Sequence, residues 1–259
     1  MKKAITLLLA VLLFLCMPGC VKEAEKETAY EIYERANAKI RDAASIMLSF
    51  QSNKTITVPG LDGAESQEVE LQYSGLVKQV TKNKQNDIDF EMDISTEGLG
   101  LRETVKAWYT GGMYYLSMFG VNTKTAMPLS EIQKQVNTEL LSFADADIIE
   151  QSVKERVDGY DLTFKLEPGG LLDALNRQVG NTSEVFNLGG IEHKFNEVGL
   201  SVFIDGKGEI KSLKLLVAYT MTGEGREVSV VEDNFMEVLQ LGGVTIAFPE
   251  DLDSYIGAK

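Results

Sequence analysis

The sequence predicts a mainly β fold of the α+β class, with about ten antiparallel strands, an N-terminal amphipathic helix and two short inserted helices. From Leu48 onward most segments alternate apolar and polar residues, which indicates half-buried strands. Glycine-containing turns separate many of these segments, as expected for hairpins. Helical spacing occurs in only three stretches. Since no linker-like composition interrupts residues 28–259, we expect a single domain there.

The composition is that of a folded globular protein. The 259 residues are 44% hydrophobic and 25% charged, which excludes a disordered chain, collagen, a coiled coil and a protein with many membrane spans. The net charge is −14 and the pI is about 4.6. Because binding to nucleic acid requires a basic face that neutralises phosphates, we expect no nucleic-acid partner.

Residues 1–19 have the layout of a secretory signal peptide. Lys2 and Lys3 precede an apolar run over residues 4–15, and a charged segment follows at residues 21–27. The run is shorter than the roughly 20 apolar residues that a membrane-spanning helix needs. The sequence therefore predicts a cleaved leader rather than a permanent transmembrane helix.

The leader ends in Met17, Pro18, Gly19 and Cys20, which resembles the lipobox of bacterial lipoproteins, although Met17 replaces the usual leucine and Pro18 is uncommon there. The resemblance implies a diacylglyceryl group on Cys20, with residues 20–27 as the lipidated tether. Two acyl chains hold a protein stably at a membrane. We therefore expect a lipid-anchored protein on the extracytoplasmic face of the cell membrane. The alternative is that Cys20 is an unmodified thiol near a cleavage site.

The N-terminal helix is predicted over about residues 28–46. Thr28 and Glu31 have the spacing of a capping box. Apolar residues then recur three and four positions apart and form one stripe: Ile32, Ala36, Ile40, Ala43 and Met47. The stripe predicts one buried face for this helix.

Strand alternation is strictest over residues 87–94, where acidic and apolar residues alternate. The acids are Asp87, Asp89, Glu91 and Asp93, and we expect them on a solvated face, since a calcium site would need ligands from elsewhere. Hairpins are predicted at residues 110–112, 158–159 and 205–208, a turn at 222–225 and a last short strand at 244–248.

Two helical segments interrupt the strands. Ser130 and Gln133 have capping-box spacing at the start of a helix over about residues 129–140. A second helix is predicted to begin near Pro168 and to continue to Val179. Residues 181–197 show no clear period and are predicted as loop.

Three phrases of the mature chain, together with the lipobox, carry a resemblance to the LolA/LolB-like lipoprotein superfamily, closest to its uncharacterised Gram-positive members and the LppX/LprG carriers. These phrases are residues 108–115, 202–210 and 243–249. The resemblance implies a curved antiparallel half-barrel whose concave side is covered by the helices, around an apolar cavity for acyl chains. Characterised relatives carry lipids or lipoproteins between membranes, or bind glycolipids.

The candidate ligand-binding residues are the Met, aromatic and aliphatic side chains on the apolar faces of the strands, which suit flexible acyl chains. They are Phe90, Met92, Tyr109, Met113, Tyr115, Phe164, Leu215, Val217 and Tyr219. The alternative for each is a place in the core under the helices. If they bind a ligand, the function is storage or transport of a lipid or another apolar molecule, without catalysis.

Motifs for catalysis and cofactors are missing from the sequence. His193, the only histidine, lies in the stretch predicted as loop and is expected to be solvated. The chain contains neither a G-x-S-x-G elbow nor a P-loop, and after cleavage no cysteine other than Cys20 remains, so we expect no cofactor and no metal. Two alternatives stay open: a cell-envelope interaction or sensor module with a filled core, and an enzyme that uses a carboxylate pair on wall glycans.

Overall fold

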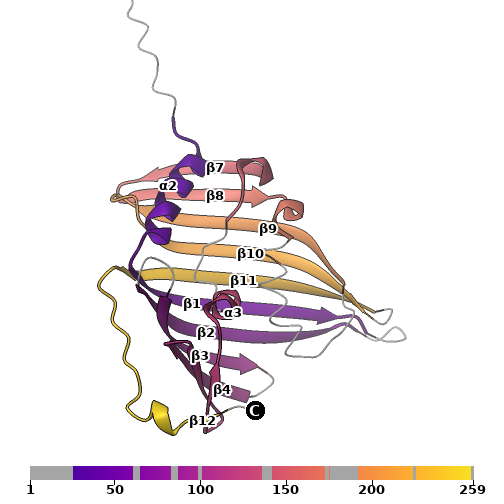
Figure 1. Ribbon diagram of the computed structural model, residues 1–259. Coiled ribbons are helices and arrows are strands. Elements are labelled where there is room, and N and C mark those ends of the chain that lie inside the picture. The colour runs from indigo at the N-terminus through magenta and orange to yellow at the C-terminus, as the bar shows by residue number, and fades with distance from the viewer. Residues whose placement is uncertain are drawn as a thin grey trace, which may run out of the picture.

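The computed structural model describes residues 26–60, 65–82, 87–98, 101–135, 142–172, 175, 192–223 and 226–257. These residues form one curved sheet of twelve strands, with two α-helices packed on one side (Figure 1). We call the side that carries the helices the concave face and the other side the convex face. The mainly β, half-barrel fold class predicted from the sequence is confirmed.

The sheet consists of two antiparallel meanders that meet at one strand pair. The strand order is β12-β6-β5-β4-β3-β2-β1-β11-β10-β9-β8-β7, and β12–β6 is the parallel pair. The elements in chain order are α2 (Ala29–Arg41), β1 (Ser45–Val58), β2 (Gln67–Lys82), β3 (Asp87–Gly98), β4 (Leu101–Thr110), β5 (Met113–Met118), β6 (Val121–Ala126), α3 (Leu129–Gln135), η1 (Asp145–Asp147), β7 (Ile148–Arg156), β8 (Gly159–Leu166), η2 (Pro168–Leu171), β9 (Glu192–Asp205), β10 (Ile210–Gly223), β11 (Arg226–Leu241), η3 (Leu252–Ser254) and β12 (Ile256–Gly257).

Helix α2 begins where the sequence predicts and ends earlier. The Thr28 hydroxyl accepts the Glu31 backbone N–H, and the Glu31 carboxylate accepts the Thr28 N–H, so the capping box is formed. The helix ends at Arg41 rather than near residue 46, because Ser45 already begins β1, which pairs with strands on both sides.

The α2 cluster is the larger of two hydrophobic clusters on the concave face. Tyr33 of α2 lies 5.1 Å from the Phe143 ring and 5.8 Å from the Phe164 ring, measured between ring centroids. Beneath α2 the cluster continues over the concave side chains of β8, β9 and β10. The helix therefore holds this end of the sheet by apolar burial.

The α3 cluster lies over β2, β3 and β4. Ile132 of α3 is fully buried there with Phe90 and Tyr109, whose rings stack 5.9 Å apart. The Tyr109 hydroxyl donates to the Met127 carbonyl just before α3, which ties the helix to the sheet. The described part of α3 ends at Gln135, so the predicted residues up to 140 lie outside the described residues.

The second inserted helix is described only at its beginning. Residues 168–171 form the 3-10 helix η2, and Leu171 and Leu175 are fully buried. Val179, the predicted end of this helix, lies outside the described residues. Residues 192–197 were expected in a loop, but they begin β9, because they pair with β10 up to Thr222.

The C-terminal segment, residues 242–257, crosses the convex face. The predicted strand at 244–248 is wrong, because these residues are extended without a strand partner. Instead, the Val244 N–H donates to Ser45 Oγ and Lys124 Nζ to the Asp253 carbonyl. The ring of Tyr255 packs edge-on against Tyr115, so the segment covers the convex side of β5.

Among the described residues, no helix combines the length and the hydropathy that crossing a membrane would require.

Replacing Phe164 by alanine tests the packing of α2. Phe164 is 4% exposed and contacts both Tyr33 and Phe143 through its ring. We expect Phe164→Ala to lower the free energy of unfolding by about 3–5 kcal/mol, measured by urea denaturation. Lys165→Ala, on the exposed side of the same strand, is the control and should change it by less than about 0.5 kcal/mol. Equal effects of the two substitutions would contradict this packing.

Candidate functional site

The strand register decides which of the predicted ligand-binding residues share a face. Phe90 lies opposite Tyr109, and Met92 follows on the same side of β3. On the other meander, Leu215, Val217 and Tyr219 alternate along β10, and Phe164 shares their face through β9. All seven lie on the concave face, as expected from their alternation.

Met113 and Tyr115 lie on the other face, which corrects the expectation that all nine residues share one surface. The two-residue turn at Gly111 and Gly112 pairs Tyr109 with Tyr114, not with Tyr115. Tyr115 therefore lies beside Trp108 on the convex face. The turn length was the available signal, because a two-residue hairpin loop fixes the register of both strands.

Most of the seven concave residues are packed in the core. Phe90 and Tyr109 belong to the α3 cluster. The other four buried residues, at most 5% exposed, belong to the α2 cluster: Phe164, Leu215, Val217 and Tyr219. Met92 is only partly buried. These six side chains contact other core residues, and their role in binding remains a prediction.

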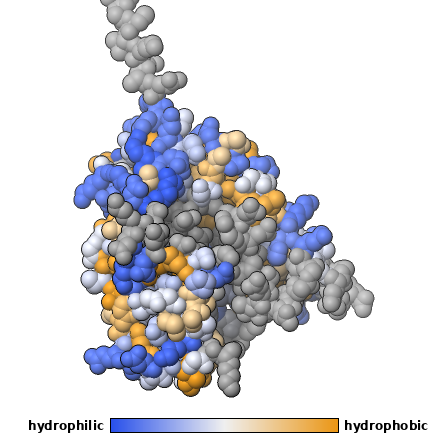
Figure 2. Space-filling model, viewed as in Figure 1, coloured by the Kyte–Doolittle hydropathy of each residue, from blue (hydrophilic) through white to orange (hydrophobic). Residues whose placement is uncertain are grey.

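Outside the fully buried residues of the two clusters, an apolar part of the concave face is only half-buried. We call it the open strip, and it consists of Ile56, Val69, Leu71, Met92, Ile94 and Val105. These side chains come from four neighbouring strands, β1 to β4. Figure 2, viewed from the side that carries the helices, shows hydrophilic and apolar side chains interspersed on this side of the molecule, with the hydrophilic ones gathered on α2. Alternation alone could place these residues on the concave face, but it could not distinguish half-buried from fully buried positions.

Gly75 of β2, next to the open strip, is in close contact with β3 and with the Phe50 side chain. A Cβ atom built on Gly75 would lie 2.4 Å from the Asp93 carbonyl oxygen and 2.8 Å from the Phe50 ring. Only glycine lets the Phe50 ring lie against β2 at this point. Phe50 itself packs against the α3 cluster, so the strip borders that cluster directly.

Next to the open strip, polar side chains cross the same face. Lys54 of β1 lies directly opposite Glu232 of β11, with 2.6 Å between Nζ and Oε1 and about 5% exposure of each side chain. The Tyr219 hydroxyl donates to Glu232 Oε1 at 2.7 Å. We call Lys54, Tyr219, Glu232, His193 and Asn234 the polar belt. Burial, and then the charge of Glu232, raise the pKa of Tyr219 far above its usual value, so it remains a donor.

His193 belongs to this belt and not to a solvated loop, which corrects the sequence-based expectation. It lies on the concave side of β9, and its ring is 5.9 Å from the Tyr219 ring. Burial, and then the positive charge of Lys54, lower its pKa below the ordinary value, so it is neutral at pH 7. The signal that was missed is weak, because a histidine does not interrupt or mark a strand.

Two atoms of the belt are buried without a hydrogen-bond partner among the described residues. They are Nε2 of His193 and Nδ2 of Asn234. Asn234 lies two residues after Glu232 on the same face of β11. His193 of β9 pairs with Met221 of β10, two residues after Tyr219, and so lies on the other side of the ion pair along the strands. The two atoms therefore flank the Lys54–Glu232 pair.

The acidic row of β3 lies on the convex face and is ion-paired rather than simply solvated. Lys82 lies 2.5 Å from Asp89, Lys78 lies 2.9 Å from Glu91, and Lys106 lies 3.2 Å from Asp93. Asp89 is only 7% exposed. Across the described residues, no three His, Cys, Asp or Glu side chains gather closely enough to hold a metal ion.

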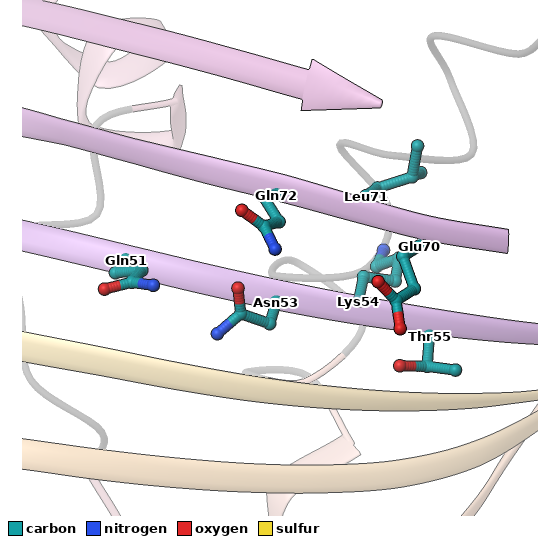
Figure 3. Close-up of a pocket in the computed structure, with 7 residues that line it drawn as sticks. All are labelled: Gln51, Asn53, Lys54, Thr55, Glu70, Leu71 and Gln72. Carbon is teal, nitrogen blue, oxygen red and sulfur yellow. The ribbon is translucent and has the colours of Figure 1, made fainter. Parts of the chain in front are cut away.

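A shallow groove of about 340 Å³ lies along β1 and β2 (Figure 3). Its lining residues are Gln51, Asn53, Lys54, Thr55, Glu70, Leu71 and Gln72. The amide, hydroxyl and carboxylate groups among them come from the convex face, whereas the register places the Lys54 and Leu71 side chains on the concave face. The groove therefore offers hydrogen bonds and little apolar surface, which does not suit an acyl chain.

The fold and the concave face together define an open β half-barrel with a partly covered apolar interior. No family model and no curated protein sequence matches the chain. Among solved structures, the chain is similar to LprF from Mycobacterium bovis, with 11% identity, a TM-score of 0.42, and coverage of 85% of this chain and 96% of that one. It is also similar to the lipoprotein LppX from Mycobacterium tuberculosis, with 13% identity, a TM-score of 0.41, and coverage of 85% and 98%.

The buried ion pair gives a first prediction for the site. We expect Lys54→Met to lower the free energy of unfolding by about 3–5 kcal/mol, because Glu232 is then buried without its partner. The double variant Lys54→Met/Glu232→Leu should recover most of this loss, since it removes both charges. Lys106→Met, at a pair whose side chains are 51% and 43% exposed, is the control and should cost less than about 1 kcal/mol. A double variant as unstable as Lys54→Met would contradict this account.

His193 gives a prediction for the pH dependence of stability. Its pKa in the folded protein lies below the ordinary 6.5 of the unfolded chain, so the unfolded state binds more protons around pH 6.5. The stabilising contribution is present above this pH and is lost as the pH falls toward the folded value. We expect the free energy of unfolding to decrease between pH 8 and pH 6, measured by urea denaturation. In His193→Gln this decrease should be absent, because the chain has no other histidine; an unchanged decrease would refute the assignment.

Proposed function

We propose that this chain is a membrane-anchored extracytoplasmic lipoprotein that binds a lipid or another apolar ligand on its concave face, without catalysis. The observation that carries the proposal is the open strip, an apolar surface of four strands that neither α2 nor α3 fully buries. Its Met and aliphatic side chains adapt to a flexible chain better than rigid groups do. An acyl chain that lies along the strip would remove water both from the apolar side chains of the strip and from its own methylene groups.

Burial of methylene groups supplies the affinity in this proposal. Each methylene removed from water contributes roughly 0.8 kcal/mol, so eight of them contribute roughly 6 kcal/mol before the costs of association. No specific polar contact is needed for this part of the binding energy. The open strip therefore suits ligands that differ in chain length.

The anchor in this proposal is Cys20, which lies outside the described residues. The first described residues, Lys26 to Thr28, are exposed and lead directly into α2. A diacylglyceryl group on Cys20 would thus be joined to the folded body through the short tether of residues 20–27. In this proposal, the sheet lies on the extracytoplasmic side of the membrane.

A second candidate function is a cell-envelope interaction or sensor module with a filled core. Two observations favour it: six of the predicted ligand-binding residues are buried in the two core clusters, and the convex face of β11 exposes apolar side chains. These are Val231, Phe235 and Leu239, each between 42% and 45% exposed. Exposed apolar surface of this kind is common at protein interfaces.

Mass spectrometry of an organic extract tests the proposed function. The chain of residues 21–259, which keeps every described element, is purified after secretion from a host that makes membrane lipids. We expect a near-stoichiometric lipid in the extract. Met92→Glu should reduce occupancy severalfold, because the open strip would then contain a charge that binding must desolvate.

The matched control is Val231→Glu, which introduces the same charge on the convex face at a side chain that is 45% exposed. It should leave lipid occupancy unchanged, and urea denaturation of both variants separates loss of binding from loss of folding. An empty extract of the unsubstituted chain would rule out the lipid-binding function. Equal loss of lipid in both variants would show that the ligand is not on the concave face.

A further inference from the structure

Three amide side chains lie together in the groove on the convex face (Figure 3). Gln51 and Asn53 lie two positions apart on β1, and Gln72 of β2 is directly opposite Asn53. We call these three residues the amide cluster. Among the described residues, no hydrogen bond links any of the three side chains to another residue. Asparagine is depleted in strands, and β1 lies in the interior of the sheet, so strand formation does not explain Asn53.

An exposed aromatic ring borders the amide cluster. Phe235 of β11 lies directly opposite Gln51 on the convex face, and its side chain is 42% exposed. Neighbouring strands lie about 4.8 Å apart, and residues two positions apart on one strand are separated by about 6.6 Å. The Cα atoms of Phe235 and of the amide cluster therefore lie within about 12 Å of one another. One small ligand can contact the ring and the amides together.

The apolar side chains on the convex side of β11 do not form a continuous patch. Asp233 lies between Val231 and Phe235 on this face, and Glu237 lies between Phe235 and Leu239. Contiguous apolar surface is the usual mark of a protein interface. A single exposed ring among amides and carboxylates instead suits a ligand whose own apolar and hydrogen-bonding groups are interspersed.

A hexopyranose sugar combines the two kinds of group that this surface can bind. The C–H groups on the face of the sugar ring pack against the negatively polarised face of an aromatic ring. The hydroxyl groups around its edge donate and accept hydrogen bonds, as an amide side chain also does. We infer that the convex groove binds a neutral glycan, with one sugar ring stacked on Phe235 and with sugar hydroxyls hydrogen-bonded to the amide cluster.

The charges around the groove favour a neutral glycan over an acidic one. The basic residue among the lining residues is Lys54, whose side chain points to the concave face and pairs with Glu232. Lys214, on the neighbouring part of the convex face, is paired with Asp233 at 2.7 Å. The exposed Glu70 carboxylate lines the groove and repels an anion. A sugar carboxylate or a phosphate would therefore be disfavoured here.

This site is separate from the open strip, because the two lie on opposite faces of β1 and β2. Binding of a glycan therefore goes beyond the proposed lipid binding and does not depend on it. A lipid on the concave face and a glycan on the convex face would not compete for the same side chains.

Isothermal titration calorimetry on the secreted chain of residues 21–259 tests the inference with three hexasaccharides. Cellohexaose and chitohexaose are neutral, and hexagalacturonic acid is acidic. We expect at least one neutral hexasaccharide to bind about tenfold or more tightly than hexagalacturonic acid. Phe235→Ala should weaken this binding about tenfold, because the stacking surface is lost. Asn53→Ala should weaken it about three- to tenfold, the effect of one lost hydrogen bond.

Leu239→Ala and Gln67→Ala are the matched controls. Leu239 is 45% exposed on β11 outside the groove, and Gln67 is an exposed amide on the concave side of β2. Neither substitution should change binding of a neutral hexasaccharide, and thermal unfolding of each variant confirms that it is folded. Met92→Glu, which should reduce lipid occupancy, should leave glycan binding unchanged, so the two sites are tested separately.

Three results would overturn the inference. They are binding of neither neutral hexasaccharide, tighter binding of hexagalacturonic acid, and binding that Phe235→Ala and Asn53→Ala leave unchanged. The first of these would leave the convex side of β11 to a protein partner. None of the three would affect the proposed lipid binding, which is measured by the organic extract.

Discussion

The pairing of β1 with β11 is the constraint on which the rest of the structure depends. It joins two antiparallel meanders, β2 to β6 on one side and β7 to β10 on the other, into one sheet. Residues 45–58 form hydrogen-bonded ladders on both edges, with β2, which follows directly, and with β11, which lies far along the chain. Without this long-range pair, each meander would have an exposed central edge, and no concave face would exist.

The buried ion pair of Lys54 and Glu232 lies within this β1–β11 pairing. Lys54 and Glu232 are direct cross-strand partners in the β1–β11 pair, so a shift of the register by one residue would put the two charges on opposite faces and separate them. Apolar neighbours alone would tolerate such a shift more easily. The same pair therefore links two properties of the molecule: the register that closes the half-barrel, and a polar position within an apolar surface.

The lengths of the elements explain why part of the concave face is left open. The 13 residues of α2 extend about 20 Å, whereas the 14 residues of β1 extend about 46 Å. Helix α3 has only 7 described residues, or about 10 Å. Over their described residues, these helices cover their own clusters and do not bury the whole face. Phe164 under α2 is therefore core, whereas Met92 and Ile94 on β3 are only half-buried.

The sequence by itself determined the fold class, the capped start of α2 and the faces of most strands, because periodicity and turn chemistry are local properties. Thr28 with Glu31 marked the start of α2, and the alternation of residues 87–94 placed Phe90 and Met92 on one side. Only the tertiary structure decided which apolar residues are core, that Tyr115 faces away from Tyr109, and that His193 joins Lys54 and Glu232. Burial and the polar belt depend on contacts between strands far apart in the chain, and a local pattern contains no information about such partners.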